Sequence, residues 1–537
     1  MLPVADLLPF LGPVLALVLG ALATLLAEPF LSRADKHKVL PWIGLGATAL
    51  SGVCLFFTRS GALLDTLAID PQRAGLLAVL LGVLALALTA LQRNLTLEDF
   101  PGGEPYVLLQ LAAVGIMLMV LSAQTIALFL GMELASLSIY PLVGLRRRDP
   151  ASAEAVLKYF AQGAAFSAVF LLGAALSYGA TGTVHFAGWV LPGREAIAFL
   201  GFALMTIGLL FKLGLAPFHF WSPDAYAGAP SGVAAFMSGA VKIGAVGALA
   251  NLWIGFLLSI SAFPMFLLGH RPPLVGDHFA PLNSATGITG QMLGSIFQVH
   301  PSLTIPGFVG FALLLFGATA VLSIVVGSFS LLGQTSVRRL VAFSGVANAG
   351  FLALGFLLPG LFFGNIQMEA TYFYLAVYAL GAAGLLTGLA ALSGPEDVAD
   401  DLASLAGTAR KHPLVGLAVT VLLASLAGLP PTAGFLAKFQ ILSGLFLNSQ
   451  ILPGMERILP AVVVAHRWIL LAVPVGAFLL AIVAAAGYFR LAVVLWSEPG
   501  TRTREPEPLP GVLTWLLGLS ALAVVVLAAL PKSLFGG

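Results

Sequence analysis

Charge is what this sequence has least of. Of its 537 residues, 9% are Asp, Glu, Lys or Arg, whereas 59% are apolar or aromatic. A soluble domain carries roughly 25% charged residues, so this chain has too few to cover its surface with solvated groups. The mean hydropathy of +1.02 indicates that most of this surface faces lipid. The composition therefore excludes a soluble protein and predicts an all-α polytopic membrane protein.

The sequence also has only one cysteine and a small net charge. The single cysteine, Cys54, lies in an apolar run, which excludes a disulfide framework, a Cys-ligated iron–sulfur cluster and a Cys-rich zinc site. The 25 basic and 23 acidic residues give a net charge of +2, so we expect no nucleic acid partner. The eight histidines lack the spacing of metal ligands. We therefore predict no cofactor and no metal in this chain, and assign any redox chemistry to partner chains.

Long apolar runs, by contrast, are abundant. Fourteen of them approach the roughly 20 residues needed to cross a hydrocarbon core about 30 Å thick. They lie near residues 7–26, 39–57, 73–91, 106–121, 124–144, 155–178, 196–219, 229–255, 308–331, 337–357, 370–392, 413–447, 467–496 and 510–530. The stretch 257–307 is rich in Gly, Pro, Ser and Thr, and is predicted to be a long loop or re-entrant insertion.

The loops between these runs differ in basic content according to the side of the membrane. One side carries Arg33, Lys36, Lys38, Arg93, Arg146, Arg147, Arg148, Arg338, Arg339, Arg410, Lys411, Arg502 and Arg504. The other side carries Arg59, Arg73, Arg194, Arg271, Arg457, Arg467 and Lys532. Cytoplasmic loops hold an excess of Lys and Arg, so the first set is predicted to be cytoplasmic and both termini to lie on the other side.

Four charged residues remain deep inside the predicted spans. They are Glu133, Lys212, Lys242 and Lys438. A charge at the bilayer centre costs about 2.5 to 3.5 kcal/mol on insertion scales, so such residues face the interior of the bundle and usually act on ions or substrates. One glutamate cannot neutralise three ammonium groups, which argues against pairing that only holds helices together.

A series of buried lysines is suited to moving protons. Burial makes a lysine release its proton more readily, and a nearby carboxylate opposes this release. A lysine whose carboxylate partner approaches or retreats is therefore a proton-binding site of adjustable affinity. Several such sites, joined by water or histidine, pass a proton through the membrane interior as each protonation repels the next. The pattern indicates an element of a proton pump.

Two of these lysines lie beside predicted helix breaks. Pro217 follows Lys212, and Pro430 with Pro431 precedes Lys438. Proline lacks the N–H that an α-helix needs, and a broken helix at membrane depth is tolerated where it lines a cavity or protein. Two interrupted helices in the two halves of a chain also indicate an internal repeat, as in transporters built from inverted halves.

His219 lies two helical turns beyond Lys212. If the helix continues, the two side chains share a face. Its imidazole either relays a proton or is simply satisfied at the membrane edge, and the spacing leaves both interpretations open.

Five segments of the chain resemble a known family. They are GMELASLSIYPLVGLRRRDPASAEAVLKYFAQGA (131–164), YGATGT (178–183), FKLGLAPFHFWSPDAYAGAPSGVAAFMSGAVKIGA (211–245), RRLVAFSGVANAGFLALG (338–355) and LAGLPPTAGFLAKF (426–439). In this order they closely resemble the antiporter-like membrane subunit N of respiratory complex I, the proton-pumping NADH:quinone oxidoreductase. The similarity covers nearly the whole chain.

The resemblance implies a division of the chain into five parts. Two inverted five-helix repeats form its centre, with broken helices at spans 7 and 12. The expected parts are N-terminal helices 1–3 (1–105), the first repeat (106–256), the insertion (257–307), the second repeat (308–496) and helix 14 (497–537).

The resemblance also implies roles for individual residues. The positions that match the family's proton-translocating residues are Glu133, Lys212, Lys242 and Lys438, and His219 matches a family histidine. In the family, the glutamate and the lysine of span 7 tune protonation, and the other two lysines continue a hydrated axis. The chain departs from the pattern at Asn348, where the family commonly has His. An amide cannot carry a proton by changing charge, so a histidine relay on span 10 is in doubt.

Partners and location follow from the same resemblance. It implies a bacterial cell (inner or plasma) membrane, other membrane-arm subunits as partners, and partner chains that carry FMN and iron–sulfur clusters and bind quinone. This chain would then be a subunit without a redox site. A subunit of a related multisubunit cation/proton antiporter or membrane-bound hydrogenase is the main alternative. An autonomous solute transporter is disfavoured because no polar pocket for an organic substrate is evident. The remaining hypothesis is a purely structural spacer, in which the lysines only form pairs.

Overall fold

The computed structural model describes residues 4–63, 65–98, 100–146, 149–186, 194–267, 305–357, 366–392, 401–451, 467–498 and 511–529. Most of these residues are helical. The α-helices are α1 (Val4–Ala27), α2 (Arg33–Phe56), α3 (Pro71–Leu97), α4 (Glu104–Leu121), α5 (Thr125–Val143), α6 (Pro150–Thr181), α7 (Glu195–Leu213), α8 (Trp221–Gly228), α9 (Ser231–Leu267), α11 (Ile305–Leu332), α12 (Val337–Leu354), α13 (Ile366–Leu392), α14 (Thr408–Lys411), α15 (Pro413–Ala427), α16 (Ala433–Ile451), α18 (Arg467–Trp496) and α19 (Gly511–Ala529).

The number of membrane crossings agrees with the sequence. Thirteen of the described helices are long and apolar enough to span a membrane. The fourteenth predicted run, 413–447, consists of two shorter apolar helices, Pro413–Ala427 and Ala433–Leu447. The predicted polytopic α-helical fold with about fourteen crossings is therefore confirmed, and one crossing is made of two pieces.

The ends of several helices are fixed by capping side chains. Asp70 accepts a hydrogen bond from the backbone of Arg73 at the start of α3, and Asp149 accepts one from Ala151 at the start of α6. Ser336 caps α12 in the same way. These side chains satisfy backbone N–H groups that have no partner inside the helix. In α3 and α6 a proline follows the cap, at a position where its missing N–H costs nothing.

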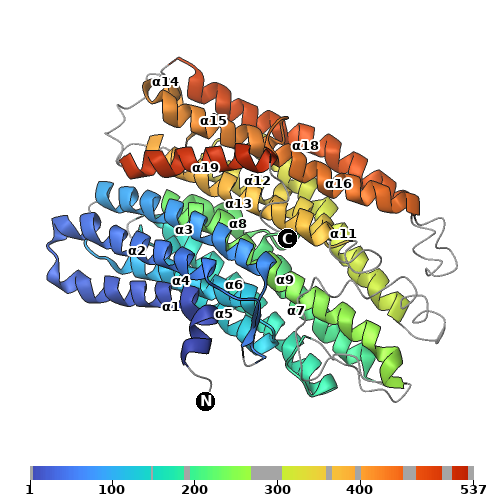
Figure 1. Ribbon diagram of the computed structural model, residues 1–537. Coiled ribbons are helices and arrows are strands. Elements are labelled where there is room, and N and C mark those ends of the chain that lie inside the picture. The colour runs from blue at the N-terminus through green and yellow to red at the C-terminus, as the bar shows by residue number, and fades with distance from the viewer. Residues whose placement is uncertain are drawn as a thin grey trace.

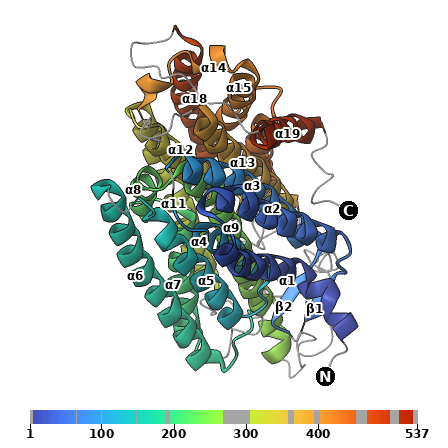
Figure 2. The same cartoon turned by 90° about the vertical axis from the view of Figure 1, so that its left-hand side faces the viewer.

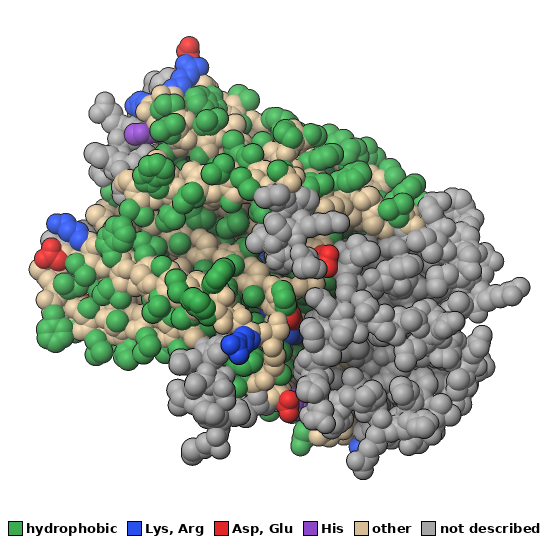
Figure 3. All heavy atoms as spheres, viewed as in Figure 1, with side chains coloured by type: hydrophobic (Ala, Val, Ile, Leu, Met, Phe, Trp, Pro, Cys, Tyr) green, Lys and Arg blue, Asp and Glu red, His purple; other side chains and the backbone are tan. Residues whose placement is uncertain are grey.

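The helices are arranged around three central ones. Both views place α3, α9 and α13 between α4–α7 on one side and α15–α18 on the other (Figures 1 and 2). The most apolar part of α9 is wholly buried inside the chain and that of α13 is 94% buried, whereas only 28% of the most apolar part of α6 is buried. Hydrophobic side chains cover most of the outer face over the described helices (Figure 3). α9 and α13 therefore form the core, and α6 presents its surface to the surroundings.

Two details differ from the sequence prediction. Strands β1 (Gly61–Leu63) and β2 (Leu67–Ile69) form an antiparallel hairpin, so the chain is not entirely α-helical. Strands of three residues are too short to give a periodic signal. Helix α9 continues to Leu267, whereas the insertion was predicted to begin at residue 257. The sequence stays mostly apolar to residue 268, which favours continuation of the helix. Helix α11 begins at Ile305, inside the predicted insertion, and residues 268–304 lie outside the described residues.

Candidate functional site

Helix α7 stops at Gly214, five residues before the end of its predicted span (196–219). Gly214 has a φ of +76°, a left-handed conformation that side chains disfavour. Its N–H donates to the carbonyl oxygen of Phe211 at 3.0 Å, and the N–H of Leu215 donates to that of Leu210 at 3.1 Å. This is the Schellman arrangement that closes a helix C-terminus.

Helix α15 ends in the same way. Gly428 has a φ of +81°. Its N–H donates to the carbonyl oxygen of Ser425 at 2.9 Å, and the N–H of Leu429 donates to that of Ala424 at 3.0 Å. The two interrupted crossings therefore share one C-terminal geometry.

The predicted prolines lie inside the two breaks. Pro217 falls between α7 and α8, and Pro430 with Pro431 falls between α15 and α16. The helices nevertheless end before these prolines, at Gly214 and Gly428. A glycine followed by leucine at the end of an apolar run was the sequence signal for this stop.

Lys242 on α9 caps the first break. Its buried Nζ donates to the carbonyl oxygen of Leu213, the last residue of α7, at 2.8 Å. The same atom lies 5.7 Å from the ring centroid of Tyr378 on α13. A helix C-terminus carries partial negative charge on its unbonded carbonyl groups, so it attracts the ammonium group.

Lys438 on α16 caps the second break. Its Nζ donates to the carbonyl oxygen of Leu426 at 2.8 Å and lies 3.5 Å from that of Ala427. It also lies 5.3 Å from the ring centroid of Phe351 on α12. The two breaks thus hold equivalent lysine–carbonyl contacts, although Lys242 comes from a different helix and Lys438 from the second half of its own crossing.

Lys212 lies in the last turn of α7 and reaches toward α5. Its Nζ donates to the Oγ of Ser136 at 2.7 Å. Glu133, one turn earlier on α5, interacts with Lys212 electrostatically. The buried Oε1 of Glu133 has no hydrogen-bond partner within the described part of the chain, and the structure records no ion pair to it there. Glu133 and Lys212 therefore act on each other through space, with Ser136 in contact with the lysine.

His219 lies in the break after α7, so its predicted helical spacing from Lys212 does not apply. The ring is half-buried, and its centroid is 6.4 Å from that of Phe343. The buried Nδ1 has no partner among the residues described. The structure therefore does not bring His219 into contact with any of the three deep lysines.

A group of polar side chains that the sequence analysis missed joins α12, α13 and α18. We call Ser344, Asn348, Tyr374 and Tyr488 the hydroxyl cluster. The Nδ2 of Asn348 donates to the carbonyl oxygen of Ser344 at 2.7 Å and to Tyr488 Oη at 3.2 Å, and Tyr374 Oη donates to Asn348 Oδ1 at 2.5 Å. The hydroxyl groups of Ser344 and Tyr488 are also hydrogen-bonded. Ser and Asn four residues apart on one helix face were the only local signal.

The three lysines share one electrostatic situation. Lys212, Lys242 and Lys438 are 4%, 5% and 8% exposed. Within the described ranges, none of the three makes an ion pair, and each donates to a neutral oxygen instead. A buried ammonium group held only by neutral acceptors is poorly stabilised, so it is able to lose its proton.

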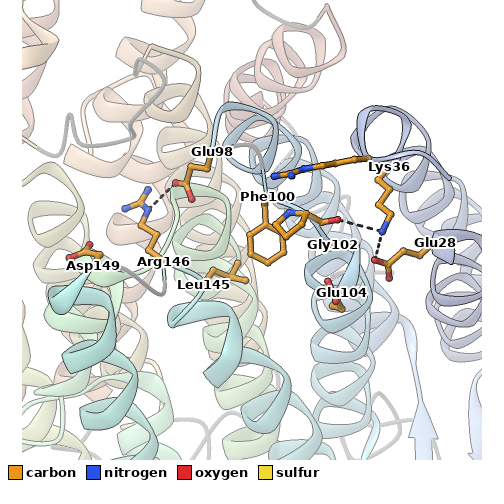
Figure 4. A pocket seen from close by; sticks show the side chains of 11 residues that line it. Glu28, Lys36, Glu98, Phe100, Gly102, Glu104, Leu145, Arg146 and Asp149 are labelled. Carbon is orange, nitrogen blue, oxygen red and sulfur yellow. Dashed lines mark hydrogen bonds and ion pairs between the residues drawn. The ribbon is translucent and has the colours of Figure 1, made fainter.

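A separate charged cleft lies at the ends of α1 to α6. It has a volume of about 950 Å³, and Figure 4 shows two ion pairs in it, Lys36 with Glu28 and Arg146 with Glu98. None of the deep lysines lines it. Among the described residues, no group of three or more His, Cys, Asp or Glu side chains is placed to hold a metal ion.

The chain is similar to membrane subunits of respiratory complexes. The family model NADH:quinone oxidoreductase/Mrp antiporter, TM matches residues 122–269 and 288–455. NADH-quinone oxidoreductase subunit N of Salinibacter ruber is 30% identical over 94% of this chain and 89% of its own length. The corresponding subunit of Chloroflexus aggregans is 30% identical over 99% and 96%.

Solved structures give the same picture of the fold. A chain of respiratory complex I from Thermus thermophilus with bound Aureothin aligns with a TM-score of 0.71 at 26% identity, covering 98% of this chain and 100% of the other. A chain of the Mrp complex from Dietzia aligns with a TM-score of 0.72 at 18% identity, covering 97% and 95%. The second likeness concerns the fold alone.

Proposed function

The chain belongs to the NADH:quinone oxidoreductase/Mrp antiporter family of membrane subunits, and from this we propose that it is a subunit N that translocates protons in a bacterial NADH:quinone oxidoreductase. The observation that carries the proposal is the series of three buried lysines, each bonded to a neutral oxygen. Two of them, Lys242 and Lys438, bind the carbonyl ends of interrupted helices. Such groups gain and lose protons when a neighbouring charge changes.

The proton series begins at Glu133 and Lys212. While the carboxylate of Glu133 is charged, it stabilises the ammonium form of Lys212 through space. When that charge is neutralised or withdrawn, Lys212 loses this stabilisation and passes a proton on. Lys242 binds the carbonyl group of the residue next to Lys212, so the charges of the two lysines repel each other. Protonation of one therefore favours release from the other.

The energy for this cycle comes from partner chains. We place electron transfer through FMN and iron–sulfur clusters to quinone in other subunits of the complex, and contacts with further membrane-arm subunits on the outer faces of this chain. The resemblance to subunit N and its relatives supports this division of labour. This chain then contributes proton movement and no redox site.

The two halves of the chain are proposed to be inverted repeats, one from α4 to α9 and one from α11 to α18. The equivalent glycine stops at Gly214 and Gly428 support this division.

Both termini are proposed to lie on the non-cytoplasmic side. The excess of Lys and Arg in alternate loops supports this orientation, and Arg33, Lys36 and Arg146 from two of those loops line one cleft. Reporter fusions at each end of the chain test it. A reporter that is active only in the cytoplasm should stay silent at both ends.

One experiment separates the proposal from its alternatives. The chain is purified from its native membrane with its partners, and proton uptake by vesicles is measured with NADH as the reductant. We expect copurification with quinone-site and iron–sulfur subunits, and loss of pumping in Lys242→Ala. An intact Lys242→Ala complex that pumps normally would support the spacer reading, and solute uptake by the chain alone in liposomes would support an autonomous transporter.

If the chain is instead a subunit of a related cation/proton antiporter or membrane-bound hydrogenase, its partners should differ. In that case the copurified chains lack a quinone site, and NADH does not drive proton uptake. A sodium-dependent proton exchange without NADH would then identify a cation/proton antiporter subunit.

A further inference from the structure

The hydroxyl cluster lies between Lys242 and Lys438. On one side, a Cβ at Gly345 would lie 3.4 Å from Cε of Lys242 and 3.0 Å from Oη of Tyr378, and Gly345 directly follows Ser344. Tyr378 is one helical turn from Tyr374 on α13. One end of the hydroxyl cluster therefore lies close to Lys242.

The other end of the hydroxyl cluster lies close to Lys438. The ring of Phe351 lies 6.2 Å from the ring of Tyr374, centroid to centroid, and 5.3 Å from the Nζ of Lys438. Phe351 and Asn348 lie one turn apart on α12. Side chains of α12 and α13 therefore connect the two lysines, and Tyr488 of α18 is bonded to Ser344 and Asn348 of this group.

The members of the cluster differ in what they are able to do with a proton. A hydroxyl group is both a donor and an acceptor, so it accepts a proton on its oxygen and releases another from the same atom. The amide of Asn348 has fixed donors and a fixed acceptor, and it is joined to Ser344, Tyr374 and Tyr488 by four hydrogen bonds. Asn348 therefore orients the hydroxyl groups without changing charge itself.

We propose that Ser344, Tyr374 and Tyr488 carry protons between Lys242 and Lys438, and that Asn348 is the positioning residue that keeps their hydroxyl groups in line. This proposal rests on the proposed function of the chain as a proton translocator. In this proposal neutral hydroxyl groups carry the proton at the place where a histidine would carry it if residue 348 were His.

The transfer is balanced in protons. The ammonium group of Lys242 becomes an amine as it gives up one proton. Ser344 and Tyr488 are bonded to each other directly, whereas Tyr374 is bonded to Asn348, and within the described residues no hydroxyl group of the cluster is bonded to either lysine, so water molecules bridge these gaps. Each hydroxyl or water oxygen takes a proton while it releases another to the next acceptor. The amine of Lys438 receives one proton and becomes an ammonium group. Only N–H and O–H bonds form and break, and rotation of the hydroxyl groups restores the starting state. Tyr378 Oη is buried without a protein partner in the described part of the chain, so it offers a hydrogen bond to a water molecule beside Lys242.

Removal of the hydroxyl groups tests the proposal in the assembled complex. Tyr374→Phe and Tyr488→Phe are made singly and together, and NADH-driven proton uptake and NADH oxidation are measured in the same vesicles. Tyr106→Phe is the matched control, because it removes a buried phenol that is hydrogen-bonded to His37, far along the chain from the cluster. We expect the double variant to lose proton uptake per NADH oxidised, because it removes two of the proton-transferring groups. The control should keep the wild-type ratio.

Substitution of Asn348 separates positioning from packing. Asn348→Leu removes all hydrogen bonds to the cluster, and we expect it to lower proton uptake as the tyrosine variants do. Asn348→His keeps hydrogen bonds to hydroxyl groups and adds an imidazole that titrates near neutral pH. We expect this variant to pump, with a new dependence of the pumping rate on pH between about 5 and 8. A purely structural role would give no such pH dependence.

The outcomes distinguish this proposal from the proposed function. Lys242→Ala is measured in parallel. Loss of pumping in Lys242→Ala with normal pumping in the assembled double tyrosine variant would overturn the hydroxyl relay and leave the proposed function standing. Normal pumping in Lys242→Ala would overturn the proposed function itself. If the double variant does not assemble, the pH profile of Asn348→His decides: an unchanged profile with normal pumping would reject the relay.

Discussion

The Nζ atom of Lys242 donates to the carbonyl oxygen of Leu213 at 2.8 Å, at the C-terminal end of helix α7. The free carbonyl groups at a helix C-terminus are costly to bury without a donor, and a buried ammonium group is costly without an acceptor. The contact satisfies both. Lys438 makes the same kind of hydrogen bond, to the carbonyl oxygen of Leu426 at 2.8 Å, in the second half of the chain. In both halves, therefore, a buried lysine and the end of a helix stabilise each other.

The glycine that ends each broken helix should be intolerant of a side chain. In Gly428→Ala, the new Cβ would be held at a positive φ and would lie 3.2 Å from Cδ of Lys438. A left-handed conformation costs a non-glycine residue about 1–2 kcal/mol, so we expect the apparent melting temperature of the purified complex to fall. Gly179→Ala is the control, because nothing lies within 4 Å of its new Cβ and Gly179 is helical. An equal effect of both changes would show that the stop at Gly428 does not determine stability.

Ser136 should matter for pumping because its Oγ is the hydrogen-bond acceptor of Lys212. Ser136→Ala leaves the ammonium group without that partner, and an unsatisfied charged group costs about 1–3 kcal/mol or more. We expect slower NADH-driven proton uptake at an unchanged amount of assembled complex. Ser138→Ala is the matched control, since the hydroxyl of Ser138 donates only to the carbonyl oxygen of Leu134 on its own helix. Equal rates in the two variants would exclude a role for the Ser136 contact.

Glu133 should affect pumping more than assembly. Its carboxylate acts on Lys212 through space, and it makes no ion pair among the described residues whose loss would loosen the helices. Glu133→Gln keeps the shape of the side chain and removes the charge, so we expect a lower pumping rate in a normally assembled complex. Glu154→Gln removes a carboxylate that pairs with Lys158 at 2.6 Å on an exposed surface, and it should pump normally. Parallel losses of pumping and assembly in Glu133→Gln would indicate a structural carboxylate.

The membrane crossings and the deep lysines were predictable from the sequence because each rests on a local signal. An apolar run of sufficient length identifies a crossing, and a lysine inside such a run stands out by its charge. The helix stop at Gly214 has a sequence signal, a glycine at the end of an apolar run, but Pro217 gives a stronger signal for a helix break three residues later. The exact end of a helix depends on backbone geometry that several neighbouring residues share.

The partners of the lysines could not be predicted, because they come from distant parts of the chain. Ser136 is far from Lys212 in sequence, and the carbonyl group that binds Lys242 belongs to no particular residue type. The hydroxyl cluster likewise unites Asn348 with Tyr488 across 140 residues. Serine, asparagine and tyrosine also occur in other helices of this chain, so no local pattern marks the few that meet.

A buried ion pair near the start of α3 should contribute more to stability than an exposed one elsewhere. Arg73 donates to Asp70 at 3.0 Å and to the side chain of Asn251 on α9 at 2.7 Å. Breaking a buried pair by removing one partner costs about 3–5 kcal/mol, so Arg73→Met should lower the apparent melting temperature strongly.

Arg339→Met is the matched control for this change. Arg339 pairs with Asp224 at 3.1 Å, but its side chain is 48% exposed. Exposed pairs contribute about 0–1 kcal/mol, so thermal unfolding of this variant should be close to that of the wild type. Because Asn251 also binds the carbonyl groups of Met119 and Val120 at the end of α4, loss of Arg73 should loosen three helices together. Similar melting temperatures for the two variants would mean that the Arg73 cluster does not hold α3 and α9 together.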